Sequence, residues 1–316
     1  MRILPSRCAV PLVAAATVVT LSLTVSLTVS AQLQAQAQAQ ASRPAVEASA
    51  VVSPVPTGEV TLLVVDAEAP LSSVTGTAFE RQVRFWPTGS DGRRWQGFVG
   101  VPIGTRAGTH AVDVRVSDAD GRTSATAVSL VVEARRYATR RLTVEERFAN
   151  PPAGQAERIA RDARRLASAF ATYRPERLWS GAFELPVPGQ STSSFGRLTV
   201  LNGQPGTRHA GADFRATTGT PVRAPNAGEI VLAEDLYFSG NTVIVDHGAG
   251  LFSLFAHFSK MQVAVGDMVA RGDVLGEAGA TGRVTGPHVH WAVRLESLAV
   301  DPLSLVRVVS EAGLAD

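Results

Sequence analysis

The sequence predicts a mostly β protein, with two β regions joined by one helix. Alternation marks the first region, where Val112, Val114 and Val116 share one face of a predicted strand and charged residues separate them. From Phe183 onward, short apolar segments are separated by glycines and show no long helical period. Between these regions, apolar residues recur every three or four positions over Ile159–Tyr173, which predicts one amphipathic helix.

The start of the chain has the composition of an export signal. Arg2 and Arg7 precede an apolar run over residues 9–29, and Val29-Ser30-Ala31 offers small residues for cleavage. The run is also just long enough to span a bilayer, so a retained membrane anchor is the alternative. Serines and threonines within the run favour cleavage. The single cysteine, Cys8, lies before the run, so the mature chain would contain no disulfide.

The next two segments predict a linker and a β domain. Residues 32–56 are rich in Ala, Gln, Ser and Pro and offer little for a core, so we expect a flexible linker. Strand signals between Gly58 and Val144 predict a small immunoglobulin-like sandwich. Its Asp118-Ala-Asp-Gly121 segment could supply calcium ligands but is more typical of a hairpin turn. The isolated His110 suggests no chemistry there.

The charge of the chain argues against nucleic acid as a partner. The formal charge of the 316 residues is +2, but removing Arg2 and Arg7 from the 30 basic residues leaves 28, against 28 acidic residues. The mature chain therefore has no overall positive field to attract a polyanion. The arginines of the predicted helix, between Arg158 and Arg165, could bind an acidic polymer, but the pattern favours a solvated helix face.

Five of the six histidines lie between positions 209 and 290. His288 and His290 alternate on a predicted strand, so they project to the same face. His209 and Asp213 lie in a glycine-containing segment that enters a strand, and His257 lies in a third strand-like run. A catalytic zinc ion takes three nitrogen or oxygen ligands of this kind and keeps a fourth position open. Together these three segments predict a metal-dependent hydrolase.

In its C-terminal region the sequence resembles a known family, the lysostaphin-like (LytM-type) zinc endopeptidases, which cut peptide cross-bridges in bacterial cell walls. The resemblance runs from about Phe183 to Leu305. The segments that carry it are Ser194-Phe-Gly196, His209-Ala-Gly-Ala-Asp213, Gly219-Thr-Pro-Val222, Gly240-Asn-Thr-Val-Ile-Val-Asp-His-Gly248, Ala256-His257, Val265-Gly-Asp267, Gly282-Arg-Val-Thr-Gly-Pro-His-Val-His-Trp291 and Asp301-Pro302. Departures are apolar exchanges: Phe255 stands where tyrosine is common, and Phe258 and Val289 replace leucines.

The resemblance implies a site and an activity. His209, Asp213 and His290 match the zinc ligands, with one zinc ion per chain, and His257 and His288 match the catalytic histidines beside the metal. The implied fold is a small β-sandwich or half-barrel with a groove for an extended peptide. The implied reaction is hydrolysis of stem or bridge peptides of peptidoglycan by an exported enzyme of the periplasm or cell envelope.

The resemblance also leaves alternatives open. Some family members are inactive proteins that bind and activate other wall hydrolases; they typically lack one or more ligands, whereas all are present here. The sandwich and the helix could form an inhibitory or docking module over the groove. The bond that is cut, the oligomeric state and the general base, His257 or His288, stay open. The membrane is a partner only if the N-terminal segment is retained.

The expected domains follow from these assignments. They are a signal peptide (1–31), a flexible linker (32–56), an immunoglobulin-like β domain (57–145), a helix with its linker (150–182) and a zinc metallopeptidase domain (183–308). Because every candidate ligand lies in the last of these, we expect residues 175–316 to be sufficient for hydrolysis.

Overall fold

A computed structural model describes residues 44–143, 151–193 and 195–314, together with positions 29, 32 and 34. The predicted signal peptide and the first part of the predicted linker therefore lie outside the described residues, apart from those three positions. Within the described part of the chain, no helix has the length and apolar character needed to cross a membrane.

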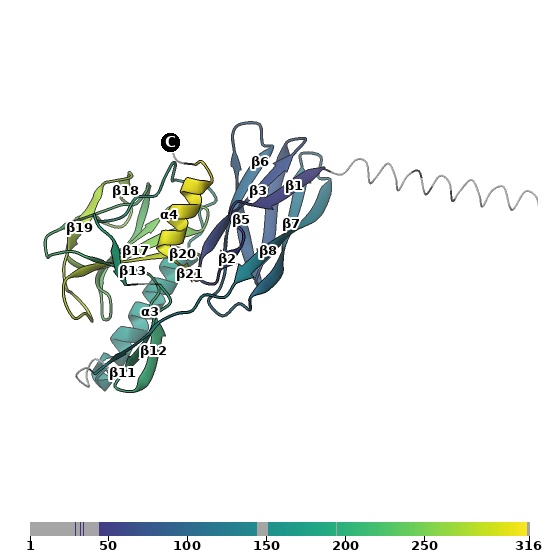
Figure 1. The fold of residues 1–316 in the computed structure, drawn as a ribbon. Helices are drawn as coiled ribbons and strands as arrows, with labels where there is room; N and C mark the ends of the chain where they lie inside the picture. The colour runs from purple at the N-terminus through teal and green to yellow at the C-terminus, as the bar shows by residue number, and fades with distance from the viewer. Residues whose placement is uncertain are drawn as a thin grey trace, which may run out of the picture. The chain divides into compact units, whose positions relative to one another are not determined.

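The N-terminal β region contains eight strands, which pair in the order β1-β3-β6-β5-β4-β7-β8-β2 (Figure 1). Their bounds are β1 (Val46–Ala50), β2 (Val55–Pro56), β3 (Val60–Ala67), β4 (Leu71–Ala78), β5 (Arg81–Thr88), β6 (Arg94–Gly100), β7 (Gly108–Asp118) and β8 (Thr123–Glu133). Strand β5 joins two sheets, since its first half pairs with β4 and its second half with β6. The predicted inward face of β7, with Val112, Val114 and Val116, is buried in the core of this region.

The expectation of a flexible linker is wrong for residues 46–56, because this range contains strands β1 and β2. Strand β1 pairs antiparallel with β3, and β2 pairs in parallel with β8. Val46, Ala48 and Ala50 alternate with polar residues and pack against the core of the sandwich. An edge strand needs only one apolar face, and small side chains suffice where the neighbouring sheet supplies the rest of the core. The linker was predicted from amino-acid composition, which takes no account of this alternation.

The predicted helix is present as α3 (Ala156–Ala171), preceded by a short 3-10 turn η1 (Ala153–Gln155). It ends two residues before Tyr173, the last residue of the predicted period. Asp162, which the helical pattern placed on the solvent side, is only 5% exposed. Its carboxylate accepts a hydrogen bond of 2.8 Å from the backbone N–H of Tyr237 and pairs with Arg161. A buried carboxylate held in this way is part of the packing.

The C-terminal region is a curled, half-barrel sheet with the order β10-β13-β20-β17-β16-β15-β18, which confirms the mostly β fold. Its strands are β10 (Ser191–Ser193), β13 (Ala212–Arg215), β14 (Pro221–Arg223), β15 (Gly228–Leu236), β16 (Gly240–Asp246), β17 (Leu251–Met261), β18 (Met268–Val269), β19 (Val274–Ala278), β20 (His288–Leu295) and β21 (Leu298–Val300). All their pairings are antiparallel. A second helix, α4 (Pro302–Glu311), follows this sheet.

Helix α4 was not foreseen, although the sequence contains its start signal. Asp301 caps the helix, and its side chain accepts a hydrogen bond from the backbone N–H of Leu303. Pro302 occupies the first turn, where a missing N–H costs nothing. Asp301-Pro302 is thus both a segment of the family resemblance and the start of a helix.

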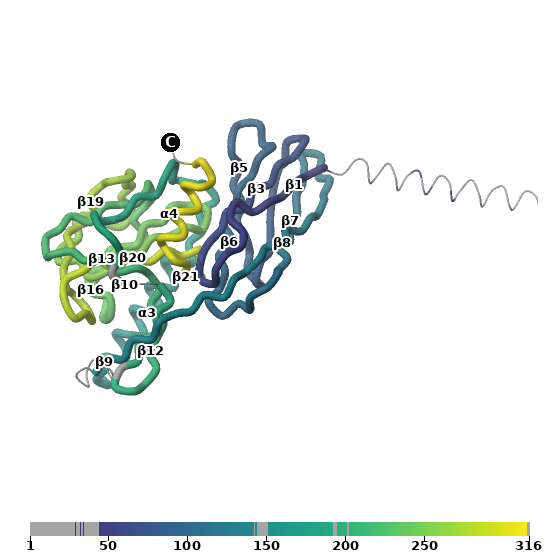
Figure 2. The backbone as a smooth tube through the Cα atoms, viewed as in Figure 1, coloured from purple at the N-terminus to yellow at the C-terminus, as the bar shows by residue number. Residues whose placement is uncertain are grey.

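A small third sheet connects the two regions of the chain. The tube in Figure 2 runs from the end of β8 to β9 (Thr139–Leu142). Strand β9 pairs in parallel with β11 (Leu198–Leu201), which forms a hairpin with β12 (Gln204–Arg208). The segment between the two β regions is thus anchored on the hairpin that leads into His209.

The half-barrel sheet buries both of its faces. One face packs into the main core through residues such as Phe255 and Trp291. The other face packs against α3 in a smaller cluster, formed by Leu232, Leu236, Ile244 and Phe252 of the sheet with Ala169 and Phe170 of the helix. Phe252 and Ala256 lie on the same face of β17, because alternate residues of a strand do, and Ala256 pairs directly with His290. Helix α3 therefore covers part of the face that carries His290.

The two β regions share a core. Trp179, which precedes the half-barrel, is 1% exposed and packs on Trp86 and Phe98 of the sandwich, with ring centroids 5.7 Å away in both pairs. An ionic cluster also joins them, since the Arg135 guanidinium contacts Asp301 at 2.8 Å and Glu59 at 3.0 Å. This shared core argues against the expectation that residues 175–316 suffice, because that fragment would expose Trp179.

Candidate metal centre

Strands β13 and β20 bring three of the predicted site residues together. The two strands pair antiparallel, with Asp213 opposite His290. His209 lies four residues before Asp213, on the segment that enters β13. That segment passes so close to β20 that a Cβ atom on Gly211 would lie 2.2 Å from the carbonyl oxygen of Trp291. Glycine at 211 therefore lets His209 approach His290.

The three side chains converge through one atom each. The Nε2 atom of His209 lies 2.9 Å from Oδ1 of Asp213 and 3.0 Å from Nδ1 of His290, which is itself 3.0 Å from Oδ1 of Asp213. In the described part of the chain, His209, Asp213 and His290 form the group of side chains that lie close enough together to bind one metal ion. Tetrahedral ligands about 2.0–2.1 Å from zinc lie about 3.3 Å apart, so the arrangement fits this ion with small adjustments.

The protonation of these groups suits metal binding. Burial by itself raises the pKa of Asp213, but hydrogen bonds from the His209 and His290 rings outweigh this effect and hold the pKa of Asp213 well below its usual range. The carboxylate is thus ionised at neutral pH. Burial lowers the pKa of His290, which keeps its imidazole neutral. An ionised carboxylate and neutral imidazoles are the forms in which these groups bind a metal ion.

His257 and His288 flank this trio. The Nδ1 atom of His257 lies 2.9 Å from the Thr281 carbonyl, and Nδ1 of His288 lies 2.9 Å from the Gly286 carbonyl. A carbonyl only accepts, so Nδ1 carries the proton in both rings and Nε2 of each neutral ring can accept one. The two ring centroids are 4.8 Å apart. Both histidines are therefore oriented by their backbone partners.

The distances place this pair next to the trio. The Nε2 atom of His288 is 3.8 Å from Oδ1 of Asp213, and the rings of His257 and His290 have centroids 6.2 Å apart. Burial lowers the pKa of His257 to about 4. Its backbone has a positive φ of 70°, uncommon for a residue with a side chain, and its N–H donates to the Ser239 carbonyl at 2.9 Å. All five predicted site residues thus lie in one region of the fold.

The remaining histidines lie elsewhere. His247 is completely buried, with Nδ1 2.7 Å from the Ala227 carbonyl and Nε2 2.9 Å from the Ser253 hydroxyl. These contacts make His247 a packing residue of the fold. His110 lies in the sandwich, where its Nε2 is 2.8 Å from the Arg106 carbonyl.

The sequence did not predict which residues hold His257 in place. The carbonyls of Phe238 and Ser239 accept hydrogen bonds from the backbone N–H groups of Arg283 and His257, respectively. Phe238 and Ser239 lie in the turn between β15 and β16. The buried Asp162 carboxylate of α3 holds the same turn, because it accepts a hydrogen bond from the backbone N–H of Tyr237. No local signal singles out Asp162, because the helical period gives the direction of a side chain and not what covers it.

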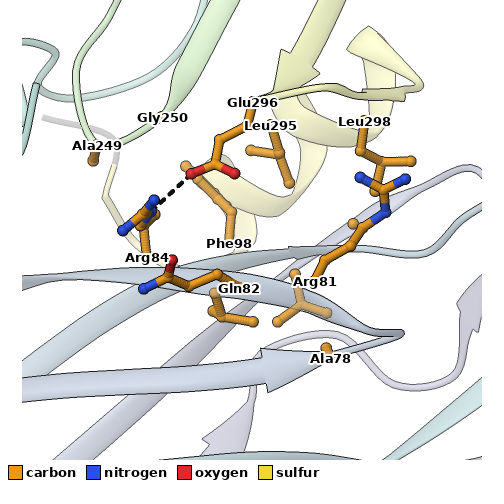
Figure 3. A pocket seen from close by; sticks show the side chains of 13 residues that line it. Ala78, Arg81, Gln82, Arg84, Phe98, Ala249, Gly250, Leu295, Glu296 and Leu298 are labelled. Carbon is orange, nitrogen blue, oxygen red and sulfur yellow. Dashed lines mark hydrogen bonds and ion pairs between the residues drawn. The ribbon is translucent and has the colours of Figure 1, made fainter. Parts of the chain in front are cut away.

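A separate cleft lies between the sandwich and the turn that joins β20 and β21. Figure 3 shows Arg84 and Glu296 facing each other across it, with 2.7 Å between Nε and Oε1. Arg81 also lines the cleft and contacts the Ser297 hydroxyl at 3.0 Å. None of the five site residues lines this cleft, and its charged side chains have partners: Arg84 pairs with Glu296, and Arg81 donates to the Ser297 hydroxyl. We therefore place the candidate chemistry at His209, Asp213 and His290, where β13 and the segment before it meet β20.

Comparison with known proteins gives an independent result. The family model described as peptidase family M23 matches residues 207–302. A solved structure from Pseudomonas aeruginosa, assigned to peptidase M23, is 33% identical, covers 82% of this chain and 97% of that chain, and aligns with a TM-score of 0.62. This neighbour therefore spans the sandwich as well as the half-barrel.

Two curated relatives match a shorter stretch. The DD-carboxypeptidase/endopeptidase Mpg of Neisseria meningitidis is 40% identical over 108 residues, which is 34% of this chain and 25% of that protein. The peptidoglycan DD-endopeptidase ShyA of Vibrio cholerae is 37% identical over 95 residues, 30% of this chain and 22% of that protein. The chain thus spans about a quarter of the length of these relatives.

Proposed function

The chain belongs to peptidase family M23, and from this premise we propose that it is an exported zinc metalloendopeptidase that hydrolyses peptide cross-links of bacterial peptidoglycan. The observation that carries the proposal is the convergence of His209, Asp213 and His290 through three donor atoms 2.9–3.0 Å apart, beside two further histidines. The similarity to DD-endopeptidases supports the choice of substrate.

In this proposal, His209, Asp213 and His290 hold one zinc ion per chain. When bound, zinc supplies a water that is acidic near neutral pH and a Lewis acid for the scissile carbonyl. The carboxylate of Asp213 balances part of the ion's charge, which leaves the site positive and suited to a developing oxyanion.

His257 and His288 are the proposed catalytic residues. The Thr281 and Gly286 carbonyls fix the proton on Nδ1 of each ring, so the two Nε2 atoms are the groups that can accept a proton. One Nε2 would take the proton of the attacking water and return it to the leaving amine, while the other ring, protonated on Nε2 as an imidazolium, would donate to the oxyanion. The low pKa of His257 keeps it neutral at neutral pH, as a proton acceptor must be.

Two features of the sequence support a place outside the cytoplasmic membrane. Arg2 and Arg7 precede the apolar run, and Ala31 closes a small-residue cleavage site. We propose that the mature chain starts near Gln32 and acts in the periplasm or cell envelope. N-terminal sequencing of the protein from envelope fractions tests this, and an intact Met1 in the membrane pellet would support a retained anchor instead.

The activity is tested with purified mature protein and cross-linked peptidoglycan. We expect new amino groups and shortened muropeptides, identified by mass, and we expect a zinc chelator to stop their release. The competing proposal is a non-catalytic protein that binds and activates other wall hydrolases. A folded, zinc-loaded chain that releases nothing alone but stimulates a separate amidase would support that alternative.

A further inference from the structure

A fourth side chain shares the face of the candidate metal centre. Asp213 and Arg215 are alternate residues of β13, so they project to the same side of the sheet, and Phe214 between them is buried on the other side. Strand β20 presents His288 and His290 in the same way. The register pairs Asp213 with His290 and Arg215 with His288.

This pairing brings Arg215 close to a proposed catalytic group. Directly opposed residues of an antiparallel pair have Cβ atoms about 4.5–5.5 Å apart. The Nε2 atom of His288 is in turn 3.8 Å from Oδ1 of Asp213. A long and flexible arginine side chain that starts opposite His288 can therefore place its guanidinium beside the candidate metal centre.

Arg215 is also available for a ligand. It is exposed, and no hydrogen bond or ion pair is found for its guanidinium within the residues that the structure describes. Three other arginines of this sheet and of α3 have partners: Arg223 donates to the Gly272 carbonyl at 2.7 Å, Arg158 pairs with Asp235, and Arg165 pairs with Glu234. Arg215 thus differs from these neighbours in both its position and its lack of a partner.

The electrostatics of the site favour an anion at this point. Two neutral imidazoles and one carboxylate leave a bound dication with a net positive charge, and a second cation on the same face adds repulsion. A carboxylate from the substrate removes that repulsion and can accept two parallel hydrogen bonds from a guanidinium.

We propose that Arg215 binds a carboxylate of the substrate beside the scissile amide. The inference rests on the proposed peptidoglycan endopeptidase activity and narrows its substrate class. In a direct link from D-alanine to diaminopimelate, a free carboxyl group is attached to the carbon that bears the scissile nitrogen. A glycyl bridge has no such charge. Arg215 therefore favours the direct, carboxylate-bearing cross-link.

The test compares two cross-linked muropeptide dimers, one with the free diaminopimelate carboxyl group and one in which this group is amidated. The variants are Arg215→Gln and Arg215→Lys, with Arg115→Gln as a matched control, because Arg115 is an exposed strand arginine on β7 of the sandwich. For each protein, kcat/KM on both dimers, equilibrium binding of both dimers and zinc content are measured.

We expect the unmodified protein to prefer the free carboxyl dimer. Arg215→Gln should lower kcat/KM on that dimer by about 10- to 100-fold, the range for a hydrogen bond to a charged group, and affect the amidated dimer much less. Arg215→Lys should keep part of the preference, and Arg115→Gln all of it. Zinc content should stay unchanged.

Two results would overturn the proposal: no preference in the unmodified protein, or an equal loss on both dimers in Arg215→Gln. Hydrolysis of neither dimer would contradict the endopeptidase proposal itself. The binding measurements would then still test the role of Arg215, because equal affinity of the unmodified protein for the two dimers would exclude a contact with the carboxylate.

Discussion

Replacing Trp179 with alanine should destabilise the whole described fold and not only the half-barrel. The indole packs on Trp86 and Phe98 of the sandwich and on Phe183 of the half-barrel, with centroid distances of 5.2–5.7 Å. It is 1% exposed, so almost its entire surface is removed from water by these contacts. Its loss would open a cavity in the core that the two regions share.

The size of the effect follows from this burial. A buried aromatic side chain removes about 150–250 Å² from water. At about 25 cal/mol per Å², this contributes about 4–6 kcal/mol as an upper bound. Large-to-small changes at buried tryptophan or phenylalanine cost about 3–5 kcal/mol. We therefore expect Trp179→Ala to lower the free energy of unfolding by about 3–5 kcal/mol.

Urea denaturation of the mature protein, followed by circular dichroism, measures this change. Tyr173→Ala is the control, because Tyr173 is 45% exposed and its main contact is the Arg84 guanidinium, 4.2 Å from the ring centroid. Its loss should cost about 1 kcal/mol or less. A cost below about 1 kcal/mol for Trp179→Ala, or separate unfolding of the two regions in the unmodified protein, would refute the shared core.

Three further predictions concern other residues. Burial lowers the pKa of His247 to about 4, so the stability from its neutral form is complete above an unfolded pKa near 6.5 and is lost as pH falls toward 4. In urea titrations, His247→Gln should remove up to about 3 kcal/mol of this acid-side dependence, and an unchanged slope would contradict it. His257→Ala and His288→Ala should keep zinc yet lose most hydrolysis; metal analysis that finds either variant empty would reverse the role of that histidine. Asp162→Ala should leave the Tyr237 N–H without its partner, cost about 1–3 kcal/mol and lower kcat, whereas Asp162→Asn should retain most of both, and equal behaviour of the two variants would exclude the hydrogen bond.

The sequence predicts those parts of the fold in which local periodicity decides the structure. The alternation around Val114 gives both the strand and its buried face, and the same period places His288 and His290 on one face. The approach of His209 to that face follows from the family resemblance and not from local pattern, because the pairing of β13 with β20 joins segments about 77 residues apart, as Asp213 and His290 are.

The sequence could not predict which distant segment packs against a given side chain. Trp179 lies outside any periodic segment, so nothing local indicates that the sandwich covers it. Asp162 lies on the polar side of a helix whose neighbour is a distant hairpin. Arg215 resembles any other arginine until the strand register places it opposite His288. In each case the missing information is a contact between distant segments, which local propensity does not encode.

The most direct test of the central claim is the zinc content of the purified mature protein and of Asp213→Ala, measured by elemental mass spectrometry after dialysis. If His209, Asp213 and His290 hold the metal, the unmodified protein retains one zinc ion per chain. The variant retains almost none, because two imidazoles remain for a dication. Full zinc occupancy in a folded Asp213→Ala variant would contradict the assignment of the metal centre, and with it the proposed mechanism.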